Sequence, residues 1–279
     1  MRILIILDPL QQIQTYKDST FAMMAEAIGR GHQVFVSQQR ELSLARGRAR
    51  VRTREIELLD PSGKAKQWYS LGEEADEPVS AFDATLMRKD PPFDMEYVYS
   101  TYLLEHAVRA GARVFNDPRA IRDHNEKLSI AEFPQFTAPM LVTRSADALR
   151  RFVEQEGVAV FKLLDGMGGT SIFRAERGDP NLSVIIETLN EFGARSVMAQ
   201  RFLPEITEGD KRVLLIGGKV VPYSLARIPK DGEFRGNLAA GGRGVARELS
   251  ASDREIGEAV AKALAPRGLL LVGLDLIGA

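Results

Sequence analysis

The stretch FKLLDGMGGTSIFR, residues 161–174, decides how the rest of the chain is interpreted. Apolar runs stand on both sides of it, so its glycines are expected in a tight turn between two strands. Gly166, Gly168 and Gly169 carry no β-carbon, which lets backbone N–H groups approach an anion closely. Lys162, on the expected incoming strand, adds a positive charge. The pattern predicts a phosphate-gripping loop, with a glycine-rich hairpin beside an unrelated surface lysine as the alternative.

Two common phosphate-binding patterns do not occur in this sequence. A Walker loop closes Gly-Lys-Ser/Thr onto a helix, and a dinucleotide fingerprint opens a helix with G-x-G-x-x-G. A second lysine, Lys127, stands earlier in the chain, on an expected helix in NDPRAIRDHNEKLSI. Two lysines that converge on a polyphosphate are electrostatically sensible. The sequence therefore predicts a third class of phosphate site, which uses Lys127 together with Lys162.

Composition favours a soluble globular protein of two or three packed units. The 279 residues carry a net charge of −1, and 44% are hydrophobic and 27% charged, which gives no indication of a nucleic-acid partner. The absence of cysteine excludes disulfides and thiolate chemistry. The apolar start at residues 3–7 is too short for a secretory signal or a membrane span. We expect a cytoplasmic protein without a membrane partner.

The first part of the chain predicts a βαβ unit with a parallel sheet. Residues 2–7 are expected to form a strand, because the apolar run from Ile3 to Leu7 is typical of a central parallel strand, and Asp8 follows at its carboxyl end. Asp18 is placed to cap a helix, which Gly31 ends before a strand at residues 33–36. A Rossmann-like domain is the expected result.

Another strand, in ATLMRKDPPFD, delivers charged side chains to a rigid Pro-Pro turn. Arg88 stands at the carboxyl end of this strand, where α/β proteins bind ligands. The alternative is a sheet-edge arginine paired with Asp90. Asp94 can cap the helix that follows.

Arginines recur in the last third of the chain. Guanidinium groups match the planar oxygens of carboxylates and phosphates, so Arg212, Arg227 and Arg235 are candidates for a site with several anions, with exposed surface arginines as the alternative. The segment KDGEFRGNLAAGGRG has few apolar anchors and predicts a mobile lid, with Arg235 and Asn237 facing the ligand. A simple linker is the alternative.

The order of these motifs resembles that of bacterial-type glutathione synthetases, in the ATP-grasp superfamily of carboxylate–amine ligases. The resemblance is carried by MRKDPPFD, NEKL, LDGMGGTSIFR, DKRVL, ARIP and RGNLAAGGRG. It implies an α/β protein with an ATP-grasp fold preceded by a Rossmann-like parallel-sheet domain. The expected units are a substrate-side domain at residues 1–122, a small lobe with the glycine loop at 123–200, and a shortened C-terminal lobe at 201–279.

The resemblance implies that ATP drives the joining of γ-glutamylcysteine to glycine through an acyl phosphate, with magnesium or manganese, in a homo-oligomer. The residues that match nucleotide contacts are Lys127, Lys162, Gly166, Gly168, Gly169, Ser171, Gln200, Arg201, Phe202, Leu203 and Asp210. The acid substrate is assigned to Asp8, Lys17 and Arg88. Charge stabilisation during catalysis is assigned to Arg212, Arg227, Arg235 and Asn237.

Asp275 matches a magnesium ligand of the family. In the family, a strand with a glutamate and an asparagine follows and completes the metal site, and residues 1–279 do not include it. Because one carboxylate holds magnesium weakly, we expect these residues to bind ATP but to ligate poorly or not at all. A ligase for another acid and amine, and a nucleotide-binding homologue without catalysis, remain as alternatives.

Overall fold

The computed structural model describes residues 1–230 and 242–278. Its contacts divide the chain into two units: unit 1 comprises Met1–Asp123 with Arg267–Leu269, and unit 2 comprises His124–Pro266 with Leu270–Ala279. Arg235 and Asn237, which the sequence predicts to belong to a lid, lie outside the described residues. Within the described ranges, none of the helices has the length and hydropathy needed to span a bilayer.

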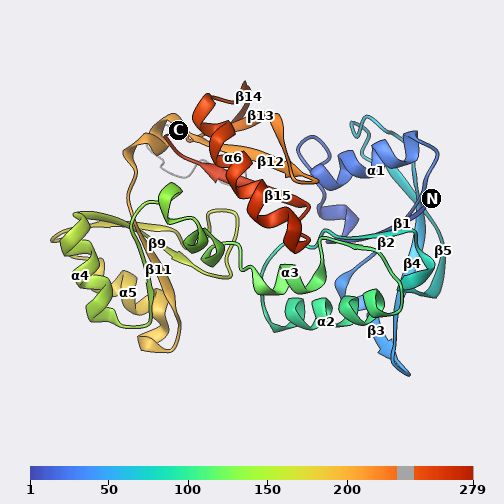
Figure 1. Cartoon of the computed structure of the whole chain (residues 1–279), viewed down its shortest axis with the longest axis horizontal. Coiled ribbons are helices and arrows are strands. Elements are labelled where there is room, and N and C mark those ends of the chain that lie inside the picture. Colours follow the sequence, from blue (N-terminus) through green and yellow to red (C-terminus); the bar gives the residue numbers. More distant parts are fainter. Residues whose placement is uncertain (231–241, 279) are drawn as a thin grey trace. The chain divides into compact units, whose positions relative to one another are not determined.

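Unit 1 is built on a seven-stranded mixed sheet in the order β3-β4-β2-β1-β6-β7, with β5 paired to β4 (Figure 1). Strands β2, β1, β6 and β7 are parallel neighbours, and the β3–β4 hairpin and β5 extend the sheet in antiparallel fashion. The strands are β1 (Arg2–Ile6), β2 (Gln33–Ser37), β3 (Leu42–Ala45), β4 (Arg48–Leu58), β5 (Tyr69–Pro78), β6 (Ala84–Met87) and β7 (Val114–Phe115). The helices are α1 (Ser19–Gly29), α2 (Met95–Arg109) and α3 (Pro118–Asp123), with 3-10 turns η1 (Leu10–Gln12), η2 (Gln39–Glu41) and η3 (Val79–Ala81).

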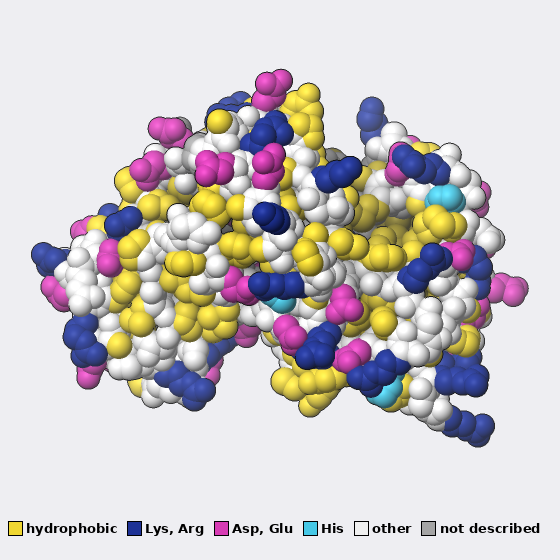
Figure 2. Space-filling model, in the orientation of Figure 1, with side chains coloured by type: hydrophobic (Ala, Val, Ile, Leu, Met, Phe, Trp, Pro, Cys, Tyr) yellow, Lys and Arg dark blue, Asp and Glu magenta, His cyan; other side chains and the backbone are white. Residues whose placement is uncertain are grey.

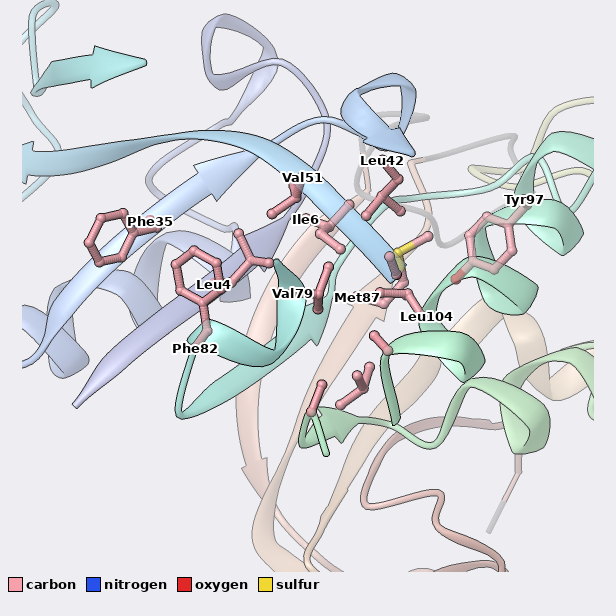
Figure 3. Packing of buried hydrophobic residues seen from close by; sticks show 14 residues of the cluster. Leu4, Ile6, Phe35, Leu42, Val51, Val79, Phe82, Met87, Tyr97 and Leu104 are labelled. Atoms are coloured by element: carbon pink, nitrogen blue, oxygen red, sulfur yellow. The ribbon is translucent and has the colours of Figure 1, made fainter. Parts of the chain in front are cut away.

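Helices α1 and α2 cover opposite faces of this sheet because successive residues of β1 point in opposite directions. Leu4 and Ile6 join the core cluster that contains Leu104 of α2 (Figure 3). Ile5 joins the other cluster, which contains Met24 of α1. The continuous apolar run of β1 is thus explained by a strand buried on both faces, as the sequence predicted.

The two helix caps expected in unit 1 are confirmed. The side chain of Asp18 accepts hydrogen bonds from the backbone N–H groups of Thr20 and Phe21, at 2.6 and 3.2 Å. Asp94 accepts one from Tyr97 at 2.9 Å. Each carboxylate satisfies backbone donors that have no partner inside the helix, which fixes where α1 and α2 begin.

The described residues of unit 2 form two antiparallel sheets of four strands each, in the orders β10-β9-β11-β8 and β14-β13-β12-β15. The first consists of β8 (Met140–Thr143), β9 (Val158–Leu163), β10 (Phe173–Glu176) and β11 (Val197–Arg201), packed against α4 (Ala146–Glu156) and α5 (Leu182–Asn190). The second consists of β12 (Asp210–Ile216), β13 (Lys219–Ile228), β14 (Arg243–Glu248) and β15 (Leu271–Leu276), and α6 (Ala251–Leu264) lies along it (Figure 1).

The expected helix around Lys127 is wrong. Helix α3 ends at Asp123, and Lys127 stands at the start of the 3-10 turn η4 (Leu128–Glu132). The side-chain oxygen of Asn125 accepts the N–H groups of Lys127 and Leu128, at 3.1 and 3.0 Å. An asparagine that bonds the backbone two and three residues ahead favours a turn over a continuing helix.

The glycine loop does connect two antiparallel strands, β9 and β10, as expected. The connection is longer than a tight turn, because β9 ends at Leu163 and β10 begins at Phe173. Ser171, expected to open the second strand, has a left-handed backbone with φ of 55° and lies in the loop.

Asp253 fixes α6 to the second sheet of unit 2. Its carboxylate is 1% exposed, forms an ion pair of 2.6 Å with Lys211 of β12, and accepts the N–H of Ser250 at 3.1 Å. Burial raises the pKa of Asp253, but the hydrogen bonds from Lys211 and Ser250 outweigh it, so the pKa lies below its usual range.

Asp253→Ala is expected to lower the free energy of unfolding by about 3 kcal/mol, because the substitution leaves the Lys211 charge without its carboxylate and removes a helix cap. A carboxyl with a lowered pKa stabilises the folded state above its unfolded pKa and loses this contribution as the pH falls through the folded pKa. Urea unfolding at neutral and acidic pH measures both effects. A deficit relative to wild type that does not shrink in acid would contradict the assignment; Glu255→Ala, on the same helix, is the control.

Candidate nucleotide and ligase site

Lys162 lies on β9 with its amine directed to the neighbouring strand β11. Its Nζ donates a hydrogen bond of 2.7 Å to Oε1 of Gln200. The two residues are brought together because β9 and β11 pair antiparallel, with Lys162 opposite Met198. Two predicted nucleotide residues are therefore in direct contact.

Lys127 and the glycine loop are also joined. The amine of Lys127 donates to the carbonyl oxygen of Gly166, and the amide of Asn125 donates to the carbonyl of Leu164 at 3.2 Å. The turn that carries Lys127 is thus attached to the loop that follows Lys162.

Two of the three loop glycines have a left-handed backbone, and the approach of the loop to an anion stays a prediction. Gly168 and Gly169 have φ of 67° and 82°, a backbone that residues with a β-carbon adopt only with strain. The loop is anchored at its start by Asp165, whose carboxylate accepts two hydrogen bonds from Arg195, at 2.5 and 2.7 Å.

The environment of Lys162 disfavours its charge. Burial, followed by the nearby charge of Lys127, lowers the pKa of Lys162, and the carboxylates of Asp275 and Asp210 oppose the shift. A bound polyphosphate would reverse the balance, because it supplies several negative charges to two adjacent amines.

A second cluster, of arginine and aspartate side chains, lies on β12, β13 and β15, which are neighbouring strands of one sheet. The buried Arg227 donates to Asp210, with one bond of 3.0 Å from Nε, and forms an ion pair of 2.8 Å with Asp275. Arg212 also donates to Asp275, at 3.0 Å from Nη2. Strand register explains the pairs, since Asp210 is opposite Arg227 and Arg212 is opposite Asp275.

The pairs in this cluster favour the charged forms of Arg227 and Asp275. Burial lowers the pKa of Arg227, but the hydrogen bond to Asp210 and the charge of Asp275 raise it further than burial lowers it. For Asp275, burial raises the pKa, and Arg212 and Arg227 together lower it below its usual range. Because Asp275 and Asp210 also influence Lys162, the lysines and the arginine cluster form one electrostatic site within unit 2.

Asp275 is the residue for which the sequence predicts a metal contact. Among the residues that the structure describes, no three His, Cys, Asp or Glu side chains are grouped as metal ligands. Two arginines bond Oδ2 of Asp275, but Oδ1 accepts from Arg212 alone, which leaves a lone pair on Oδ1 for a cation. This fits magnesium, which keeps several waters and takes its other ligands from phosphates.

The predicted substrate residues of unit 1 are only partly brought together. Asp8 forms an ion pair of 2.9 Å with Lys89 and accepts the N–H of Asp90 at 2.8 Å. Arg88 donates to the hydroxyls of Ser19 and Thr20 at the start of α1, at 2.9 and 3.2 Å. The alternative pairing of Arg88 with Asp90 does not occur.

Lys17 stands apart from these contacts. Its amine lies 5.5 Å from the ring centre of the exposed Tyr16.

The remaining nucleotide candidates lie at the end of β11 and directly after it. Arg201 is the exposed last residue of the strand, the guanidinium of Arg174 lies 5.1 Å from the ring centre of Phe202, and Leu203 precedes the 3-10 turn η7 (Pro204–Glu208). Their role with nucleotide stays a prediction.

Sequence reasoning missed Asn125 and Arg195, which hold the loop and Lys127 in place. Asn125 carried a usable signal, because an asparagine two residues before Lys127 favours a turn there. Arg195 carried none, because its partner Asp165 is 30 residues away in the chain.

Lys162→Ala is expected to lower ATP affinity by about 1.5–3 kcal/mol, the range for a lost charged hydrogen bond. Titration calorimetry measures the change, and Lys219→Ala, an exposed lysine on β13, is the matched control. Equal ATP affinity in wild type and Lys162→Ala would refute the role of Lys162.

We also expect ATP binding to be accompanied by proton uptake, at pH values between the lowered pKa of Lys162 in the free protein and its higher pKa in the complex. The pKa of Lys162 is lowered in the free protein and should rise next to phosphates, so between the two values the amine is neutral before binding and charged after it. Calorimetry in buffers of different ionisation enthalpy measures the uptake. It should disappear in Lys162→Ala and persist in Lys219→Ala; uptake that survives in Lys162→Ala would assign it to another group.

Comparison with known proteins agrees with this geometry. The family models "Prokaryotic glutathione synthetase, N-terminal domain" and "Prokaryotic glutathione synthetase, ATP-grasp domain" match residues 1–122 and 126–279. A relative named glutathione synthetase from Nitrosomonas europaea is 57% identical over 278 residues, which cover 100% of this chain and 87% of the relative. The protein of the same name from Bordetella parapertussis is 56% identical, over 100% of this chain and 88% of its own length.

Solved structures with low sequence identity share the fold. D-cycloserine synthetase DcsG superimposes with a TM-score of 0.66 at 15% identity, over 99% of this chain and 86% of that one. D-alanyl-alanine synthetase A from Vibrio cholerae gives 0.62 at 13% identity, over 98% and 83%. The expected ATP-grasp fold is confirmed. The chain belongs to the prokaryotic glutathione synthetase family and is an ATP-dependent ligase.

Proposed function

We propose that the protein joins γ-glutamylcysteine to glycine and converts ATP to ADP and phosphate. The expectation that residues 1–279 ligate poorly stays a prediction, which the assay of ADP release below decides. The observation that carries the proposal is the concentration of four cations, Lys127, Lys162, Arg212 and Arg227, around the glycine loop and two carboxylates of one unit. A reaction through an acyl phosphate requires cations for the triphosphate and for the intermediate. The names of the relatives supply the substrate pair.

The chemistry needs no side-chain nucleophile. A carboxylate oxygen of the acid substrate attacks the terminal phosphorus of ATP, so that a new O–P bond forms as the O–P bond to ADP breaks. The amine of glycine, after its ammonium has lost a proton to solvent, then attacks the acyl carbon; the C–O bond breaks, phosphate leaves, and the nitrogen loses a second proton. Lys127 and Lys162 would hold the phosphates. Arg227 and Arg212, which are held in place by Asp210 and Asp275, would stabilise the negative charge that develops on the transferred group.

A magnesium ion, or manganese in its place, would be held through Asp275 and the nucleotide phosphates. When bound, the ion neutralises phosphate charge during transfer. The arginines that grip Asp275 would orient its free lone pair.

Further roles complete the proposal. Asp8, Lys17 and Arg88 would bind the acid substrate, and Gly166, Gly168, Gly169, Ser171 and residues 200–203 the nucleotide. The functional domains are 1–122, 123–200 and 201–279. The protein is a cytoplasmic homo-oligomer.

Lysine, arginine and acidic side chains are interspersed on the face drawn in Figure 2, which gives no support for a nucleic-acid partner.

The test measures ADP release with γ-glutamylcysteine and glycine, with each omitted, and with other acid and amine pairs. Release that requires both substrates and yields glutathione supports the proposal. Release with another pair only would identify a different ligase, and ATP binding without release under any pair would identify a protein that no longer catalyses.

A further inference from the structure

A cavity of about 200 Å³ lies in unit 1, beside the carboxyl ends of β1 and β2. Its apolar floor includes Leu7, Leu10 and Val36, and β4 and β5 supply charged side chains at its sides. Its volume exceeds the roughly 30 Å³ share of a single water and admits a group of several heavy atoms. The carboxyl ends of parallel strands are the usual place for ligands in α/β sheets.

Arg52 supplies a cation to this cavity without a partner of its own. Its neighbours on β4 are paired, Arg50 with Asp76 at 3.0 Å and Arg54 with Glu74 at 3.2 Å. Arg52 is opposite Asp76 in the strand register, but Arg50 occupies that carboxylate. Within residues 1–230 and 242–278, the guanidinium of Arg52 has no hydrogen bond or ion pair.

Glu41 supplies the matching anion. Its Oε2 accepts the N–H of Gln38 at 3.0 Å and the hydroxyl of Ser37 at 3.3 Å. No described residue donates to its Oε1, and no described cation pairs with it. The hydroxyl of Ser37 also donates to the carbonyl of Arg52 at 2.7 Å, so Ser37 links Glu41 to the strand that carries Arg52 without the two charges neutralising each other.

The other charges of the cavity are already balanced. Glu74 is paired with Arg54, and Asp8 is paired with Lys89. What remains is one guanidinium and one carboxylate in a pocket with an apolar floor. A ligand that carries one ammonium and one carboxylate on the same carbon complements this pair, because each of its charges meets an opposite one.

We propose that this cavity binds a free α-amino-acid head group, with the carboxylate on Arg52 and the ammonium on Glu41. Two sources have this chemistry: the glutamyl end of the acid substrate, which is remote from the carboxylate that reacts, and a free amino acid. The first source rests on the proposed function. The second does not.

The test uses calorimetric titration of the protein with γ-glutamylcysteine, and separately with L-glutamate. Arg52→Gln is expected to weaken binding about tenfold, the lower end of the effect of a charged hydrogen bond, and to leave ATP affinity unchanged. Arg48→Gln, an exposed arginine of the same strand outside the cavity, should bind like wild type. Thermal unfolding confirms that each variant is folded.

A second variant tests the ammonium contact. Glu41→Gln keeps an acceptor for Gln38 and Ser37 but removes the charge, so it should weaken γ-glutamylcysteine about tenfold. Glutarylcysteine, which lacks the ammonium, should bind wild type and Glu41→Gln equally. A purely structural role of Glu41 would affect both ligands alike.

The titrations distinguish the glutamyl end of the acid substrate from a free amino acid as the ligand. They also distinguish failure of this binding site from failure of the proposed ligation. Losses for γ-glutamylcysteine support the substrate end, and losses for L-glutamate alone support a free amino acid. Unchanged affinity for both ligands in folded Arg52→Gln and Glu41→Gln overturns the site. If these variants weaken γ-glutamylcysteine but the wild type forms no product with glycine, the site stands and the proposed ligation fails.

Discussion

Replacing Arg227 by alanine is expected to lower kcat about 1000-fold, the upper end for removal of one charge-stabilising donor from a catalytic site. Arg227 is 7% exposed and is the residue shared by Asp210 and Asp275. Its loss would remove positive charge from the site and would leave two carboxylates facing the place where phosphate is expected. ATP turnover with γ-glutamylcysteine and glycine measures the effect.

Two controls separate catalysis from folding. Arg247→Ala, an exposed arginine on β14 of the same sheet, should retain full activity. The double variant Arg227→Ala with Asp210→Asn removes the charge of one carboxylate that Arg227→Ala leaves unpaired. It should therefore recover stability in urea unfolding but should not recover turnover. Turnover that returns with stability would show that Arg227 acts only on the fold, and near-normal turnover in Arg227→Ala alone would remove it from the mechanism.

The elements that sequence predicted well are those fixed by local pattern. The apolar run of β1, the caps Asp18 and Asp94, and the apolar strands on both sides of the glycine loop follow from periodicity and hydrogen-bonding side chains a few residues apart. The sequence predicted that Lys127 and Lys162 converge on a polyphosphate, but it did not predict the contact of Lys127 with the glycine loop. The turn at Lys127 was missed because Asn125, and not helix propensity, decides the backbone there.

The arginine cluster shows the limit of sequence reasoning. Arg212, Arg227 and Asp275 were each candidates, but their pairing depends on the register of β12 with β13 and β15. Strand register between segments 63 residues apart is set by packing of the whole sheet, so local pattern cannot supply it. The unpaired state of Arg52 could not be predicted for the same reason, because the pairs Arg50–Asp76 and Arg54–Glu74 depend on how β4 and β5 meet.

Asp275→Asn is expected to weaken the binding of divalent metal with nucleotide at least tenfold and to lower kcat about 1000-fold, because metal neutralisation of phosphate charge contributes several kcal/mol to phosphoryl transfer. Asparagine keeps the size and one acceptor oxygen, so Arg212 can still donate to it.

The affinity for divalent metal should be measured in the absence of turnover, by titrating Mn²⁺ into the protein with ADP and following the free ion by electron paramagnetic resonance. Glu248→Gln, an exposed carboxylate on β14 of the same sheet, is the control and should match wild type in both measurements. If Asp275→Asn binds Mn²⁺ like wild type but turns over slowly, Asp275 serves to position Arg212 and Arg227, since the lost charge then matters only through these arginines. If both measurements are unchanged, Asp275 has no part in the site, and the cation must be held by phosphates and water alone.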